Sequence, residues 1–289
     1  MALDTILVCL DGSEASLRIL PALRRLLLLP DRPGRLGGAA PRSGPALVLL
    51  HVVPTTPGSG AGELELGQTR RELEELRLEL EQRGRTASVR IARGEPADQI
   101  LAVAADLRAH LIAMATHGRT GADRLVRGSV AESVLRRSRI PVLLVNPRTY
   151  LPGEAGTIAR RILVPVEASP ESRAILPLVG AVARLAAAEV LLVHVEAEPG
   201  QGTHQEIFAA AREALAAAGG AARVREVVPT GAPAAAILAT IDQERADLVV
   251  MTTHGREGLE RLWIGSVAEA VARACPVPVV VQRVRAPEQ

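Results

Sequence analysis

The sequence predicts an α/β protein made of two doubly wound, five-stranded parallel sheets in tandem, of the flavodoxin or Rossmann-like type. Two observations carry this prediction: the chain repeats itself, and short apolar runs alternate with helical patterns within each copy. Nearly continuous apolar runs are typical of strands buried on both faces of a parallel sheet. A chain of 289 residues with 48% hydrophobic content also suits two domains of ordinary size.

Matching blocks recur in the same order along the chain. The stretch ILVCLDGSEAS at 6–16 matches ILVPVEASPES at 162–172, and AHLIAMATHGR at 109–119 matches ADLVVMTTHGR at 246–256. The offset falls from 156 to 137 residues, mostly because of a Gly/Pro-rich insertion at 31–45 in the first copy. We therefore expect domains at 1–149 and 158–289, with a linker between Asn146 and Ala159.

The elements of the first copy follow in order. Runs rich in β-branched and aliphatic residues predict five strands, at 6–10, 47–53, 88–92, 111–116 and 141–145. Helical periodicity and propensity predict four helices, at 13–29, 63–83, 96–108 and 129–139. Pro21 and Pro177 occupy equivalent points of the first helices, which predicts a kink there.

Composition disfavours two classes of partner. All 34 basic residues are arginine, they are spread among 32 acidic residues, and only three aromatic residues occur, so neither a basic footprint nor stacking platforms for nucleic acid are indicated. No apolar run approaches the ~20 residues of a membrane span, and no secretory leader is recognisable. Two cysteines without CxxC spacing fit a reducing compartment. We expect a cytoplasmic protein that binds neither nucleic acid nor membrane.

The most informative motif is a glycine segment present in both copies. Gly118 is followed ten residues later by Gly128 and Ser129, and Gly255 by Gly265 and Ser266. One interpretation is a capping box, in which Ser129 or Ser266 caps a helix together with Glu132 or Glu269 three residues later. The other is a phosphate cradle, in which glycine amides and the helix N-terminus receive an anion, with Arg119, Arg124 or Arg127 adding charge. The residues alone leave both open.

Other chemistry is disfavoured by missing residues. A Walker A loop requires lysine, no GxGxxG follows the first strand, and no GxSxG nucleophile elbow is present. His51, His117, His194 and His254 lie at predicted strand ends, but without cysteines or HExxH spacing they suggest loop hydrogen bonds rather than a metal site. Catalysis is not indicated, and a slow ATPase is the most that the sequence supports.

These residues identify the chain as similar to the universal stress protein family, with two consecutive copies. The ATP-binding branch of that family has a Gly, two residues, Gly, nine residues, then Gly followed by Ser or Thr. Here the second and third glycines match, whereas the first is replaced by Ala115 in copy one and Thr252 in copy two. The resemblance implies the sheet order 3-2-1-4-5 and fifth strands that pair, so that the two copies form an internal pseudo-dimer.

The resemblance also implies ATP, with or without Mg²⁺, as the bound ligand. The implied nucleotide site of copy one comprises Cys9, Asp11, Val52, Met114, Ala115, Gly118, Arg119, Gly128, Ser129 and Val130. The implied and weaker site of copy two comprises Pro165, Glu167, Val195, Met251, Thr252, Gly255, Gly265, Ser266 and Val267. A further homodimer of chains stays open.

Copy one keeps the pattern better, since Asp11 becomes Glu167 in copy two. We therefore expect a stress-response protein that binds adenine nucleotide mainly in copy one and whose ligand state modulates partner interactions. The alternative is a nucleotide-free dimerisation or scaffold module with degenerate sites.

Overall fold

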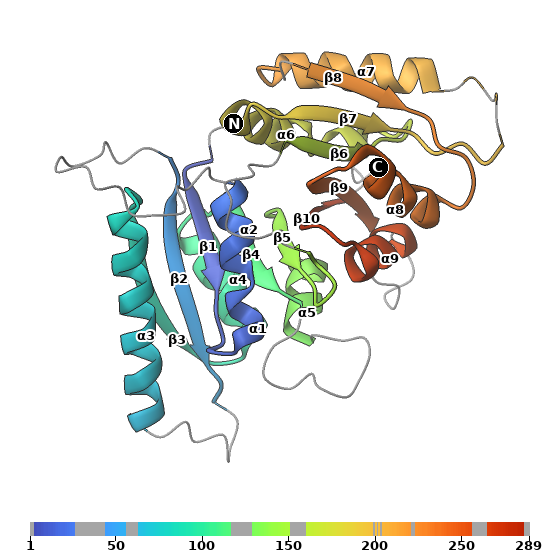
Figure 1. The fold of residues 1–289 in the computed structure, drawn as a ribbon. Coiled ribbons are helices and arrows are strands. Elements are labelled where there is room, and N and C mark those ends of the chain that lie inside the picture. Colours follow the sequence, from blue (N-terminus) through green and yellow to red (C-terminus); the bar gives the residue numbers. More distant parts are fainter. Residues whose placement is uncertain are drawn as a thin grey trace.

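The computed structural model describes residues 3–26, 44–55, 63–116, 129–150, 160–198, 200, 202, 204–220, 223–255 and 265–285. Within these residues the strands form one sheet in the order β3-β2-β1-β4-β5-β10-β9-β6-β7-β8 (Figure 1). We call β1 to β5, with their helices, the first half and β6 to β10, with theirs, the second half. The predicted order 3-2-1-4-5 is confirmed in each half.

The elements alternate along the chain as the repeat predicts. The first half contains β1 (Thr5–Cys9), α1 (Glu14–Leu17), α2 (Ile19–Leu26), β2 (Ala46–Val53), α3 (Glu63–Gln82), β3 (Ala87–Arg93), α4 (Pro96–Asp106), β4 (Leu111–Ala115), α5 (Ser129–Arg137) and β5 (Val142–Val145). The second half contains β6 (Arg161–Pro165), the 3₁₀ turn η1 (Pro170–Arg173), α6 (Leu176–Ala186), β7 (Glu189–Val193), α7 (His204–Ala217), β8 (Arg223–Val227), α8 (Pro233–Glu244), β9 (Leu248–Gly255), α9 (Ser266–Ala274) and β10 (Val279–Arg285).

Neighbouring strands are parallel throughout each half, and the halves meet at one antiparallel pair. Leu143 of β5 lies opposite Val280 of β10, so the two predicted five-stranded sheets continue into each other. An apolar edge strand left uncovered exposes both its backbone groups and its side chains. Pairing β5 with β10 removes that edge from both halves at once.

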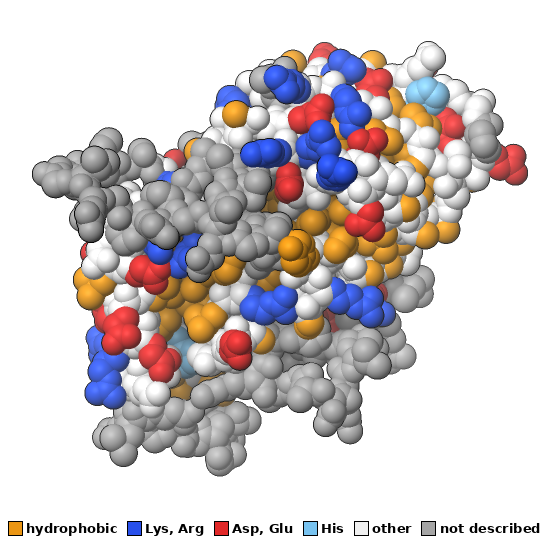
Figure 2. Space-filling view, viewed as in Figure 1, with side chains coloured by type: hydrophobic (Ala, Val, Ile, Leu, Met, Phe, Trp, Pro, Cys, Tyr) orange, Lys and Arg blue, Asp and Glu red, His pale blue; other side chains and the backbone are white. Residues whose placement is uncertain are grey.

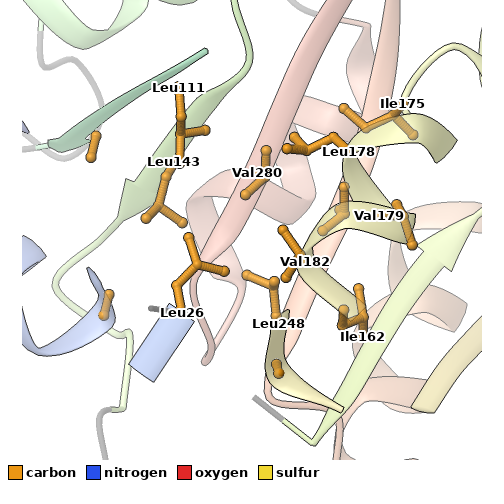
Figure 3. Close-up of a cluster of buried hydrophobic side chains, with 14 of the residues drawn as sticks. Leu26, Leu111, Leu143, Ile162, Ile175, Leu178, Val179, Val182, Leu248 and Val280 are labelled. Carbon is orange, nitrogen blue, oxygen red and sulfur yellow. The ribbon is translucent and has the colours of Figure 1, made fainter. Parts of the chain in front are cut away.

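The hydrophobic core lies on both faces of this sheet and continues across the two halves. Helices α2, α3, α6 and α7 cover one face, and α4, α5, α8 and α9 cover the other. Figure 3 shows Leu143 and Leu26 from the first half packed near Val280, Leu248 and Val182 from the second. Because strand residues alternate between the faces, each buried strand contributes to both layers.

The first helix of each half differs from the prediction. Instead of one kinked helix over 13–29, the described residues form α1 and α2, which are separated at Arg18, and the second half has η1 followed by α6. Pro21 and Pro177 lie in the first turn of the second helix of each pair. Proline has no N–H to donate, which costs nothing in a first turn but breaks a helix interior. The prolines therefore mark helix starts rather than kinks.

The surface carries charges of both signs in alternation. On the face in Figure 2, basic and acidic side chains lie beside one another rather than in patches of one sign. Ion pairs account for part of this pattern, including Arg161 with Glu189 at 3.1 Å and Arg225 with Glu244. Within the described residues, no helix combines the length and the apolar character that crossing a membrane requires.

The two halves differ at the start of β4 and β9, where His110 and Asp247 occupy matched positions. The Asp247 carboxylate accepts hydrogen bonds from the backbone N–H groups of Arg160 at 2.8 Å and Arg161 at 3.0 Å. In contrast, Nδ1 of His110 is buried and has no hydrogen-bond partner, while its Nε2 lies 4.0 Å from an exposed Asp4 carboxylate. An exposed pair at that distance contributes little.

We expect His110→Asn to raise the free energy of unfolding by about 1 kcal/mol, the net value of one hydrogen bond. The asparagine removes the unsatisfied ring nitrogen and places an amide oxygen where Asp247 accepts two amides in the other half. Urea titration measures the change. Asp247→Ala is the matched control and should destabilise; an unchanged midpoint for the asparagine variant would contradict the prediction.

Candidate functional site

The candidate site lies where the strand order reverses. β1 pairs with β2 on one side and with β4 on the other, and all three strands point the same way. In open α/β sheets, ligands bind beyond the carboxyl ends of the strands at such a reversal. Asp11 follows β1 and Thr116 follows β4, so the repeated polar segments of the first half emerge at this edge. The pairing of β6 with β7 and β9 repeats the arrangement in the second half.

In the first half, the segment after β1 forms a tight polar turn. Oδ1 of Asp11 accepts hydrogen bonds from the backbone N–H of Ser13 at 2.9 Å and from its hydroxyl at 2.5 Å. Ser13 in turn caps α1 by accepting the amide of Ser16 at 3.1 Å. Gly12 supports the turn with a φ of 79°, a left-handed conformation that glycine adopts without strain. The half-buried Asp11 carboxylate is thus held at the carboxyl end of β1.

The second half builds this turn differently. Glu167 replaces Asp11 and is exposed, and Ala168 stands in place of the left-handed glycine. Ser172 still bridges the turn, since its hydroxyl donates to the Glu167 carbonyl at 2.8 Å and lies 3.2 Å from the Glu167 amide nitrogen. The backbone turn is therefore kept in both halves, whereas the carboxylate is held in place only by the aspartate turn of the first half.

The apolar positions implied for the base are buried or half-buried. Cys9 and Met114 in the first half and Met251 in the second are buried, while Val52 and Val195 are half-buried and pack against the same core layer. Pro165 ends β6 opposite Val193. Burial raises the pKa of the Cys9 thiol to about 12, so this side chain is a neutral apolar wall at physiological pH.

The histidines at the ends of β2 and β7 have a structural role. Nδ1 of His51 lies 2.9 Å from the Leu10 carbonyl, and Nδ1 of His194 lies 2.9 Å from the Val166 carbonyl. Because a carbonyl only accepts, Nδ1 carries the proton in both rings. Each histidine thus extends the first-to-second strand pairing beyond the ladder. His117 lies outside the described residues, and within the described part no group of three metal-binding side chains converges.

The N-terminus of α9 contradicts the capping-box interpretation of Ser266. The N-cap residue of α9 is Gly265, Ser266 is the first helical residue, and no described side chain caps this end. The Glu269 side chain pairs with Arg273 instead of reaching back. The capping-box interpretation is therefore wrong for Ser266, because the chain enters the helix one residue earlier than expected. Among the described residues, no side chain caps the first-turn amides of α9.

Thr253 is a site residue that the sequence reasoning missed. Its buried hydroxyl accepts a hydrogen bond from the Gly265 N–H at 2.8 Å. This bond joins the end of β9 to the start of α9 across the intervening segment. A threonine directly before His254, matched by Thr116 before His117, was the available signal. The role of this threonine depends on whether the start of the next helix packs against the end of the strand, and the spacing in the sequence does not reveal that contact.

Several implied residues lie outside the described part of the chain: Gly118, Arg119, Gly128, and the arginines at 124 and 127. Of the others, Ser129 begins α5, and Val130 and Val267 are half-buried in the first turns of α5 and α9. Ala115 ends β4 opposite Val145. In the second half, the hydrogen bond between Gly265 and Thr253 joins the start of α9 to the end of β9.

The fourth strand of each half leads into the glycine segment. β4 covers Leu111–Ala115 and the residues directly after Thr116 lie outside the described part, whereas β9 is described to Gly255, which lies opposite Arg285 of β10. The residue that replaces the first glycine of the motif lies in a sheet ladder in both halves: Ala115 is opposite Val145, and Thr252 is opposite Gln282. Backbone groups engaged with β10 are not available to a ligand.

Comparison with known proteins agrees with this architecture. The model of the universal stress protein family matches residues 2–146 and again residues 159–283. The chain belongs to the universal stress protein family. The two matches lie one in each half, as the internal repeat predicts.

Individual relatives resemble this universal stress protein to different extents. Universal stress protein MJ0531 from Methanocaldococcus jannaschii is 47% identical over 51 residues, which is 18% of this chain and 30% of that relative. A solved universal stress protein from Archaeoglobus fulgidus superposes with a TM-score of 0.74 at 23% identity, covering 98% of this chain and 99% of that one. A Pseudomonas aeruginosa structure gives 0.64 at 20% identity, covering 98% and 94%. The solved structures show a shared fold across both halves.

Proposed function

We propose that this tandem universal stress protein is a cytoplasmic stress-response protein that binds adenine nucleotide, with ATP, with or without Mg²⁺, as the ligand, and that the first half binds it more strongly. The observation that carries the proposal is the helix start at the candidate site. Within the described residues the first turn of α9 has no side-chain cap, and α5 begins at the matched residue of the first half. Uncapped helix N-termini offer N–H groups and a positive dipole end to an anion.

The residues present fit the chemistry of this ligand. Bound ATP supplies an apolar base, ribose hydroxyls and an anionic phosphate chain. Cys9 and Met114 provide buried apolar walls. The Asp11 carboxylate is held in place by two hydrogen bonds from Ser13, and in this proposal it accepts hydrogen bonds from the ribose hydroxyls. In this proposal Gly118, Arg119, Gly128 and Ser129 hold the phosphates, with Val52, Ala115 and Val130 lining the remainder.

One asymmetry among the described residues supports stronger binding in the first half. Oδ1 of Asp11 accepts two hydrogen bonds from Ser13, whereas the matched Glu167 is exposed. This difference removes a fixed carboxylate from the second half rather than from the first. Antiparallel pairing of β5 with β10 supports the further proposal that the halves act as an intramolecular pseudo-dimer whose ligand state modulates partner binding.

The test is calorimetric titration of the intact protein with ATP and Mg²⁺, combined with mass spectrometry of any nucleotide that co-purifies. Gly118→Val should weaken ATP binding at least tenfold, because a branched side chain obstructs the backbone approach to phosphate. The matched Gly255→Val in the second half should have a smaller effect. An intact protein that carries no nucleotide and ignores millimolar ATP would favour the scaffold alternative. Turnover above background that Gly118→Val abolishes would instead indicate an ATPase.

A further inference from the structure

The last helix of the second half ends against a side chain of the first. Nδ2 of Asn146, the residue after β5, donates hydrogen bonds to the carbonyls of Ala272 and Cys275, both at 3.0 Å. Asn146 is only 4% exposed. Its orientation is fixed because its Oδ1 accepts the Arg148 amide at 2.7 Å. One buried asparagine of the first half therefore satisfies two carbonyls at the end of α9.

The reverse contact exists at the matched position of the other copy. Arg283 on β10 lies 137 residues after Asn146, the same offset that relates α5 to α9. Its guanidinium donates to the carbonyl of Arg136, in the last turn of α5. Each half thus supplies one donor to the C-terminal end of the other half's last helix, although the two donors are different residue types.

Donors at this end of a helix stabilise it for two reasons. The last four carbonyls of an α-helix have no partner within the helix, and they form the negative end of its dipole. Asn146 supplies two N–H groups, and Arg283 adds a positive charge. Both contacts therefore hold the C-terminal ends of α9 and α5 in place. Their donors also interact favourably with the negative ends of the two helix dipoles.

The same two helices begin at the candidate sites. α5 starts at Ser129 in the first half, and α9 starts at Ser266 behind Gly265 in the second. Each helix is nine residues long, so its two ends are only about 13 Å apart at 1.5 Å per residue. Because each helix is short and rigid, a donor that fixes its C-terminal end also fixes the direction of the N–H groups at its N-terminus.

We propose that Arg283 is a positioning residue for the nucleotide site of the first half, acting through α5, and that Asn146 is one for the second half, acting through α9. This inference rests on the proposed function, because it assigns these residues to sites that bind nucleotide. Each site then depends on a donor from the opposite half.

The experiment uses the intact chain, with ATP and Mg²⁺ as the probe, and follows hydrogen–deuterium exchange of residues 129–137 and 266–274 while ATP is titrated. Arg283→Met should weaken the ATP-dependent protection of 129–137 about three- to tenfold in apparent affinity. Arg283→Lys keeps the cation and should return the affinity to within about twofold of the original protein. Arg148→Met removes the same charge from an exposed side chain nearby and should change nothing.

Asn146→Leu should act on the other half, reducing ATP-dependent protection of 266–274 and leaving 129–137 unchanged. Should this variant fail to fold, the two Arg283 variants decide the matter. Exchange without ATP shows separately whether the last turn of α5 loosens in Arg283→Met.

The outcomes separate the two proposals. An unaltered protein with no ATP-dependent protection in 129–137 contradicts the proposed function itself. An unaltered protein that binds ATP, together with an Arg283→Met variant that binds equally well although α5 exchanges faster, contradicts only the positioning role. Equal weakening by Arg148→Met would also overturn it, since the effect would then be one of overall charge.

Discussion

Asn146→Asp is expected to lower the free energy of unfolding by at least about 3 kcal/mol at neutral pH. The change replaces the amide that donates to Ala272 and Cys275 with an oxygen, so two carbonyls lose their donor and face a negative charge in a buried site. Leaving buried polar groups unpaired costs ~1–3 kcal/mol each, and the carboxylate also lies at the negative end of the α9 dipole.

The pH dependence of this variant provides a second readout. Burial beside carbonyls raises the pKa of the new aspartate in the folded protein above its unfolded value of about 4. Below pH 4 the carboxyl is protonated in both states, so the ionisation penalty is absent. The penalty grows as the pH rises from about 4 to the folded-state pKa, above which it is constant.

Urea titrations at several pH values measure this effect. Gln205→Glu makes the same amide-to-carboxylate change at an exposed position of α7 and should alter stability by less than about 0.5 kcal/mol. A stability loss for Asn146→Asp that is as small as this control, or that does not diminish in acid, would show that Asn146 does not hold α9.

Leu143→Ala is expected to cost about 3 kcal/mol and to destabilise both halves together. Leu143 is 1% exposed and lies opposite Val280, in a core layer that contains residues of both halves (Figure 3). Truncating a buried leucine typically costs 2–5 kcal/mol, because transfer energy is lost and a cavity remains. A cavity at the junction weakens packing on both sides of it.

Urea unfolding gives the total change, and hydrogen–deuterium exchange assigns it to β4 and β9. Leu78→Ala is the control, since Leu78 of α3 is 48% exposed and its truncation should cost less than about 1 kcal/mol. Faster exchange confined to the first half would mean that the halves are independent folding units and that the shared core layer does not couple them.

Much of the fold was predictable from local patterns. The apolar runs predicted the strands to within a few residues, since burial on both faces demands continuous apolar sequence, and the repeat predicted the same order twice. The start of the helix at Ser266 was not predictable from its Ser-x-x-Glu spacing. The same spacing suits a serine at the N-cap or one residue inside the helix, and the backbone path through Gly265 decides between them.

The candidate site was predictable only as a set of positions at one sheet edge. Asp11 and Glu167 stand at matched positions, yet only Asp11 is held by a left-handed glycine turn. Thr253 was missed because its partner, Gly265, lies twelve residues away along the chain, and its hydrogen bond exists only once the helix returns to the strand.

The sequence by itself determined that this chain is two copies of one α/β unit with polar segments at the strand ends, because hydrophobic periodicity and glycine placement are local properties. The tertiary structure alone decided that β5 and β10 join the copies into one sheet and that Asn146 and Arg283 each reach the opposite half's last helix. These contacts join residues more than 120 positions apart whose types differ between the copies. Their partners are set by the packing of the two halves, which no repeat or local periodicity records.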